Sequence, residues 1–146
     1  MAMRSRTPWK TKLHPEQQPA VVPDRRGTML VPTPLQVARA LRRVPTGRLI
    51  TAAQLRTRLA RAAGADFACP LTTGIFLNIV AGATEEALAE GRRAVAPWWR
   101  VVDERGGLPP KFPPGAAVQA ARLRAEGHRV TREGRVRDAA GALVRA

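Results

Sequence analysis

Proline and glycine divide this chain into short segments, and this division limits the folds that it can adopt. The 146 residues include 13 prolines and 12 glycines. Proline has no backbone N–H, and glycine readily takes a positive φ, so both residues interrupt helices and strands. We therefore expect several short helices joined by turns.

Both ends of the chain are polar and basic, and we expect neither to join the core. In the first 30 residues, prolines at positions 8, 15, 19 and 23 remove backbone donors at short intervals. This composition predicts a basic arm, extended or disordered, that Trp9 could anchor, with a solvated tail as the alternative. Residues 129–146 are predicted as a basic tail with a possible small hairpin about Glu133-Gly134.

Three segments have the spacing and end signals of helices. Thr33 followed by Pro34 predicts a first helix start. Thr51 would cap a second helix over residues 52–63, with Gly64 as its C-terminal stop. A third helix would begin at Thr72 or Thr73. Its predicted core-facing residues share a helical spacing and are Ile75, Phe76, Ile79, Val80, Ala83 and Ala87.

The second half of the chain carries turn signals and one more helix. Residues 95–102 are predicted as a strand or a tight extended turn, and residues 103–107 as a turn. A last helix is predicted over residues 116–126, ended by Gly127. The order predicts a mainly α fold with a small β wing, a winged-helix-like DNA-binding domain over residues 31–128.

Charge and cysteine content restrict the partners and cofactors. Lys and Arg number 25 against 11 Asp and Glu, a net charge of +14, which favours a polyanion as ligand. With Cys69 alone and His14 far from His128, we expect no disulfide, metal site or cofactor. No apolar run approaches ~20 residues, and no apolar stretch follows the basic start. We expect a cytoplasmic, nucleoid-associated monomer without a membrane segment.

Four segments, in the same order, resemble the methylated-DNA–cysteine methyltransferases. Residues 44–55 resemble the family's Ile-Pro-x-Gly-Arg-Val-x-Thr-x-x-Gln-Ile segment, and residues 97–102 (Pro-Trp-Trp-Arg-Val-Val) resemble its Pro-Cys-His-Arg-Val-Ile strand. Residues 107–115 are similar to its Gly-x-Leu…Tyr-x-Gly-Gly segment, and residues 119–127 to its closing Leu-Leu-x-x-Glu-Gly helix. The resemblance covers residues 33–128 and implies a winged-helix-like DNA-binding domain.

The residues at the family's reaction centre differ here. Trp98 stands at the acceptor cysteine, Trp99 at its partner histidine, and Glu126 at the glutamate that orients that histidine. Alkyl transfer needs a thiolate, so transfer to position 98 is excluded, and we expect Glu126 to be only part of the last helical turn. With tryptophan in place of the acceptor cysteine, the chain is similar to the alkyltransferase-like proteins, which bind alkylated guanine without repairing it.

Further departures imply a divergent branch. The alkyltransferase-like proteins keep histidine after the tryptophan, and Ala52 stands here where the family has a tyrosine that turns the target phosphate. Residues 71–80 contain no arginine to fill the base stack, the asparagine hinge before the active-site strand is missing, and residues 84–94 look like an insertion.

The predicted lesion pocket is aromatic. Trp98, Trp99 and Phe112, the last at the family's pocket tyrosine, are predicted to accept an extruded base by stacking. In an extended segment neighbouring side chains point to opposite faces, which favours Trp98 over Trp99. The alternative is that one or both tryptophans fill the core.

The predicted DNA contacts are polar or cationic side chains: Thr72, Thr73, Asn78, Arg48, Arg100 and Lys111. The two threonines could instead cap the third helix, whose start could also hold a phosphate. Cys69 is considered as a displaced acceptor, although most lone cysteines are small buried hydrophobes.

Together these features predict a non-enzymatic, alkyltransferase-like DNA-binding protein. It would sense alkylated guanine in double-stranded DNA by base extrusion and signal to a repair-pathway protein. The alternative is a general basic DNA- or RNA-binding module with a closed, vestigial pocket. A third class, a transferase that uses Cys69, would show an added alkyl group in the protein mass.

Overall fold

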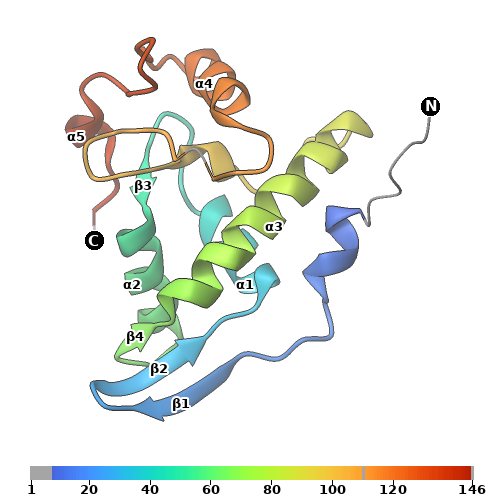
Figure 1. Ribbon diagram of the computed structural model, residues 1–146, viewed down its shortest axis with the longest axis vertical. Helices are drawn as coiled ribbons and strands as arrows, with labels where there is room; N and C mark the ends of the chain where they lie inside the picture. Colours follow the sequence, from blue (N-terminus) through green and yellow to red (C-terminus); the bar gives the residue numbers. More distant parts are fainter. Residues whose placement is uncertain (1–7, 110, 146) are drawn as a thin grey trace.

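The computed structural model describes residues 8–109 and 111–145, and its centre is the long helix α3 (Figure 1). In chain order the elements are η1 (Trp9–Leu13), β1 (Ala20–Asp24), β2 (Gly27–Val31), α1 (Pro34–Arg42), β3 (Ile50–Thr51), α2 (Ala52–Ala63), β4 (Phe67–Ala68), α3 (Pro70–Ala89), η2 (Trp98–Arg100), β5 (Val101–Val102), α4 (Ala116–Ala125) and α5 (Ala139–Ala142). Helices α1 and α2 and the turn η1 pack against α3. The predicted class, mainly helical with a small sheet, is confirmed.

Helices α1 and α2 begin with the same capping box. The hydroxyls of Thr33 and Thr51 accept hydrogen bonds from the backbone N–H groups of Gln36 and Gln54, at 3.2 and 3.0 Å. Each glutamine side chain accepts a 3.0 Å bond from the N–H of its threonine in return. These bonds satisfy backbone donors that a helix start leaves free. The predicted starts, and the stop of α2 at Gly64 (φ 71°), are confirmed.

Helix α3 starts earlier than predicted, and only part of its predicted core face is buried. Of the residues predicted to face the core, Val80 and Ala83 are buried. Phe76, Ile79 and Ala87 are half-buried. Pro70 is its first residue and Cys69 its N-cap, so Thr72 and Thr73 do not cap it. Ile75, predicted to face the core, is 49% exposed. The residues of α3 that are buried are Thr73, Leu77, Val80, Ala81, Gly82, Ala83 and Thr84. Apolar residues occur all around this helix, so its spacing alone does not select the buried face. Neither α3 nor any other helix in the described ranges has the length and hydrophobicity to cross a membrane.

The N-terminal segment contains a β-hairpin where the sequence predicts an arm without regular structure. Strands β1 and β2 pair antiparallel, and β2 pairs in parallel with β4 to make a three-stranded sheet. Pro23 lies in β1, an edge strand, where its missing N–H costs no sheet hydrogen bond. Gly27 closes the hairpin at φ 127°, beside Asp66. Residues 1–7 of the predicted arm lie outside the described residues.

Trp9 attaches the segment before the hairpin to α3. Glu86 accepts hydrogen bonds from the backbone N–H groups of Trp9 and Lys10, both at 2.9 Å. The indole of Trp9 lies against Gly82, so closely that a Cβ at this glycine would collide with the ring. Through these contacts Trp9 anchors the N-terminal segment to α3, as the sequence suggests.

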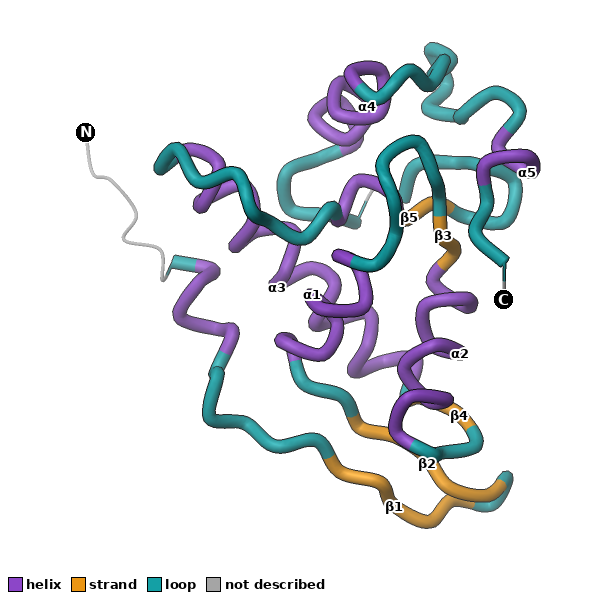
Figure 2. The backbone as a smooth tube through the Cα atoms, turned by 180° about the vertical axis from the view of Figure 1, so that it is seen from behind, coloured by secondary structure: helices purple, strands orange, loops and turns teal. Residues whose placement is uncertain are grey.

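The C-terminal segment packs on the domain, although its composition predicts a tail outside the core. Residues 130 and 136 pair across a small turn that contains Glu133-Gly134, as expected. Beyond this turn, Val136, Ala139 and Val144 are buried. Figure 2 shows that most of the chain after β5 is loop. The tail is held by backbone bonds: the N–H of Val144 donates to the carbonyl of Leu49 at 2.8 Å.

Candidate functional site

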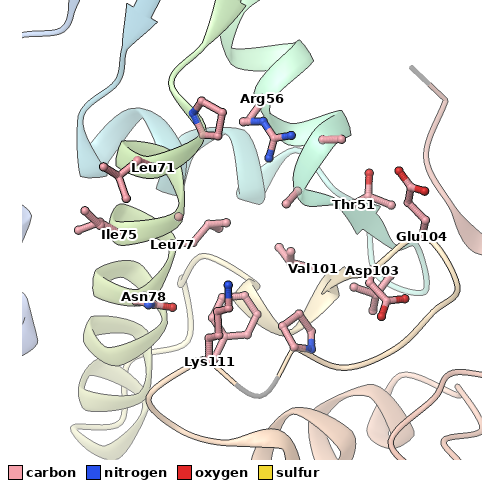
Figure 3. Close-up of a pocket in the computed structure, with 17 residues that line it drawn as sticks. Thr51, Arg56, Leu71, Ile75, Leu77, Asn78, Val101, Asp103, Glu104 and Lys111 are labelled. Carbon is pink, nitrogen blue, oxygen red and sulfur yellow. The ribbon is translucent and has the colours of Figure 1, made fainter.

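A cavity of about 680 Å³ lies between α2, α3 and the segment from Val101 to Phe112 (Figure 3). Ligand cavities in proteins typically have volumes of ~300–1,000 Å³. Thr51, the N-cap of α2, and Pro70, the first residue of α3, both line it. A helix start carries partial positive charge. Two helix starts border this cavity, although the capping box already uses donors of α2, and the first residue of α3 is a proline without an N–H. The charged side chains that line it are two cations, Arg56 and Lys111, and two carboxylates, Asp103 and Glu104.

Some charged side chains of this cavity already form hydrogen bonds within the protein, and others have no ion-pair partner. Asp103 accepts hydrogen bonds from the N–H groups of Arg105 and Gly107, at 2.8 and 2.7 Å, and so stabilises its own turn. Arg56 on α2 and Lys111 lie at opposite sides of the cavity in Figure 3. Within the described ranges, neither cation has an ion-pair partner. Both can therefore meet an anion.

The wall that α3 contributes is largely apolar. Leu71 is 74% exposed and Ile75 is 49% exposed, and both line the cavity together with Asn78. Figure 3 shows the three side chains along one side of α3. Large exposed apolar side chains beside a cavity are typical of an interaction surface. Asn78 adds a group that can both donate and accept hydrogen bonds.

Trp98, the predicted wall of the lesion pocket, is instead fully buried in the core. Its ring packs edge-on against Phe112 and Trp99, with ring centres 5.3 and 6.2 Å away. Its Nε1 donates a 3.0 Å hydrogen bond to Glu85. Of the three predicted aromatic residues, Phe112 lines the cavity and the two tryptophans do not.

The local backbone explains this difference. Residues 98–100 form a 3₁₀ turn, η2, and not the extended segment from which alternating faces were predicted. Three residues complete one turn of a 3₁₀ helix, so neighbouring side chains do not point in opposite directions. Trp98 and Trp99 consequently both pack against the protein interior, with Trp99 only 9% exposed.

Glu126 is the centre of a buried hydrogen-bond network that joins the end of α4 to η2. It accepts bonds from Nε1 of Trp99 at 2.8 Å, from Nη2 of Arg100 at 2.6 Å and from the N–H of Gly47 at 3.2 Å. Burial raises the pKa of Glu126, but the hydrogen bonds from Arg100, Trp99 and Gly47 outweigh burial and hold its pKa below the ordinary value. The expectation that Glu126 only completes a helical turn is therefore wrong.

Arg100 cannot make the DNA contact predicted for it in this conformation. The residue is 9% exposed, and its Nη1 donates a 2.6 Å hydrogen bond to the carbonyl of Val44. Its Nη2 also donates to the hydroxyl of Thr46 at 3.1 Å. The partners of Arg100 lie 26 to 56 residues away in the chain, which is why the local pattern does not reveal them.

The other predicted DNA contacts lie in different places. Thr73 is buried at 1% exposure, which contradicts a contact with DNA, and Thr72 donates to Sγ of Cys69 at 3.2 Å. Arg48 is exposed but lies outside this cavity. Asn78 and Lys111 do line it.

Two residues that line the cavity, Arg56 and Thr51, were not among the predicted site residues. The sequence contains one signal for Arg56, because it lies just over one helical turn after the N-cap Thr51.

Comparison with known proteins shows a likeness in fold. No protein-family model and no curated protein matches the sequence. Among solved structures, the alkyltransferase-like protein ATL of S. pombe in complex with DNA is similar at a TM-score of 0.52 and 21% identity, over 77% of this chain and 94% of that chain. S. pombe Atl1 in complex with damaged DNA containing O6-carboxymethylguanine has a TM-score of 0.47 and 20% identity, over the same shares. The predicted winged-helix-like fold class is thereby confirmed.

Proposed function

We propose that this protein binds double-stranded DNA without catalysing a reaction, in the manner of an alkyltransferase-like protein. The observation that carries the proposal is the cavity bordered by the starts of α2 and α3, with Arg56 and Lys111 on its walls. The net charge of +14 supports a polyanionic partner. The likeness in fold to an alkyltransferase-like protein in complex with DNA supports the same class of partner.

The proposed ligand of the cavity is an extruded, alkylated guanine. Phe112 lines the cavity at 5% exposure and would contact the base through the part of its ring that is accessible. Asn78 would form hydrogen bonds with the edge of the base. Arg56, Lys111 and the two helix starts would neutralise the flanking phosphates. The outcome would be recruitment of a repair-pathway protein.

The absence of transfer chemistry is part of the proposal. At the position of the acceptor, the Trp98 indole is buried and offers no nucleophile. Hydrogen bonds from the side chain and the N–H of Thr72 lower the pKa of Cys69, but no general base contacts this thiol in the described part of the chain. Incubation with alkylated duplex should leave the intact mass unchanged. A gain equal to one alkyl group would overturn this part of the proposal.

A general DNA- or RNA-binding module is the second candidate. The complete burial of Trp98 and its packing on Phe112 favour it, because the core beneath the cavity is already filled. Such a module would bind through charge alone. Its affinity would not depend on a lesion and would fall steeply with salt.

Fluorescence anisotropy with two matched duplexes tests both candidates. One duplex is plain, the other carries a single O6-alkylguanine, and each is titrated at two salt concentrations. A lesion sensor binds the second duplex more tightly, and the preference persists at the higher salt. Phe112→Leu should abolish the preference and keep the affinity for plain DNA, while Phe76→Leu, a half-buried control on α3 outside the cavity, should keep both.

Each result of the titration decides between the candidates. Equal affinity for the two duplexes, with the same loss in salt, would favour the general module over the sensor. Equal affinity for plain and alkylated single-stranded RNA would strengthen that conclusion. No binding to either duplex would overturn the lesion sensor, and no binding to the duplexes or to the RNA would overturn both candidates.

A further inference from the structure

A second cavity, of about 420 Å³, lies among loops near the ends of α4 and α5. Three segments far apart in the sequence form it: residues 46–48 before β3, residues 127–129 after α4, and residues of the stretch 137–142 around α5. None of its lining residues also lines the first cavity. Figure 2 shows this part of the chain as loops beside α4 and α5.

The lining of this second cavity is strongly cationic. Arg48, Arg129 and Arg137 line it, and Asp138 is the one acidic residue among the described residues that do so, which gives these four side chains a net charge of +2. As far as the structure describes the chain, none of the three arginines has an ion-pair partner. Like charges that share a concave surface repel one another unless an anion lies between them.

The backbone keeps the arginines together. The N–H of Arg137 donates a 2.9 Å hydrogen bond to the carbonyl of Arg129, which pairs the two residues across the C-terminal turn. Nη1 of Arg48 donates to the carbonyl of Gly141 at 3.1 Å, so its guanidinium is oriented and its other N–H groups are available to a ligand. Gly47, next to Arg48, is held by Glu126. The loops of this cavity are therefore fixed by the same network that holds η2.

We propose that this second cavity binds a phosphate of the DNA backbone, as a contact separate from the first cavity. The proposal rests on the proposed function. Planar guanidinium groups are suited to phosphate because they present several N–H donors in one plane. Arg48 is three residues from Thr51 in the first cavity, at most ~10 Å along an extended chain. Phosphates follow one another about every 3.4 Å of helix axis along each strand, so this separation corresponds to only a few nucleotides of one strand.

The salt dependence of DNA binding tests this contact. The double variant R129Q/R137Q removes two charges from the cavity, and R93Q/R132Q removes two charges from exposed arginines that do not line it. Affinity for the plain duplex is measured over a range of salt concentrations. Each lost phosphate contact should reduce the slope of log Kobs against log[salt] by ~0.9. We expect the cavity variant to lose about one unit of slope, for the one phosphate contact, and the control less than half of that.

The results separate this inference from the proposed function. Equal slopes for the cavity variant and the control would overturn the phosphate site, even if the wild type distinguishes the two duplexes. Failure of the wild type to bind DNA would overturn the function and the site together. Arg48→Gln provides a second, single variant, which should lose about one unit of slope. The preference for alkylated DNA should be unchanged in all of these variants, because the first cavity is intact.

Discussion

The guanidinium of Arg100 and the carboxylate of Glu126 form a buried ion pair, with 2.6 Å between Nη2 and Oε2 and only 10% of each side chain exposed. The desolvation of such a pair costs free energy, which additional hydrogen bonds must offset. Here Trp99 and Gly47 also donate to the carboxylate, and Val44 accepts from the guanidinium. The pair thus fixes the turn that carries the two tryptophans.

Removal of the Glu126 carboxylate should destabilise the fold strongly. Glu126→Ala leaves the charge of Arg100 buried without a partner, so we expect the free energy of unfolding to fall by about 3–5 kcal/mol. Urea denaturation followed by circular dichroism measures this change. The matched control is Glu133→Ala in the exposed C-terminal turn, which should stay within about 0.5 kcal/mol of the wild type. A loss below about 1 kcal/mol for Glu126→Ala would contradict the buried pair.

The same carboxylate predicts a direction for the pH dependence of stability. The pKa of Glu126 is lower in the folded protein than its ordinary value of 4.5, so the unfolded chain takes up the proton first as the pH falls. The stabilisation is therefore complete above the ordinary value and is lost as the pH falls through the lowered pKa. Denaturation experiments from about pH 7 to pH 3 measure this effect. The difference in stability between wild type and Glu126→Gln should narrow as the pH falls below the ordinary pKa of a glutamate. A difference that widens on acidification would have the wrong sign.

Trp98 should behave as a core residue in stability measurements. Its side chain is fully buried, so Trp98→Ala creates a cavity and removes a hydrogen bond to Glu85. We expect a loss of about 3–5 kcal/mol in the free energy of unfolding. Trp9→Ala, at a half-buried tryptophan on η1, should cost clearly less. Equal costs for the two variants would mean that Trp98 is not packed in the core in solution.

Two glycines of α3 offer a matched pair of substitutions. Gly82→Ala places a methyl group against the Trp9 ring, whereas the Cβ of an alanine at Gly74 meets, among the described residues and apart from its own helix backbone, no atom within 4 Å. We expect Gly82→Ala to displace η1, seen as a shift of tryptophan fluorescence to longer wavelength and faster proteolysis near residue 9. Gly74→Ala should leave both unchanged and stabilise the protein by up to ~1 kcal/mol through helix propensity. Identical proteolysis of the two variants would argue against the docked position of Trp9.

Local signals predicted the first two helices and the existence of the third, but not the start of the third helix or all of its buried face. The capping residues of α1 and α2 lie within three positions of each other, so their hydrogen bonds can be read directly from the sequence. The buried face of α3 depends on what packs against it, and Ile75 is consequently exposed where the spacing predicts burial. The β1–β2 hairpin was missed because Pro23 is compatible with a strand only at a sheet edge.

For the candidate site, the sequence by itself determined that alkyl-transfer chemistry is absent at positions 98 and 99 and that the net charge of the protein is positive. Tryptophan at positions 98 and 99 excludes a thiolate there in any fold, and the excess of arginine is independent of conformation. Only the tertiary structure decided which residues meet. Phe112, Asn78 and Lys111 line one cavity, whereas Arg100 is drawn into the core by Glu126. The physical reason is that burial and ion pairing depend on partners tens of residues away, and no local pattern contains them.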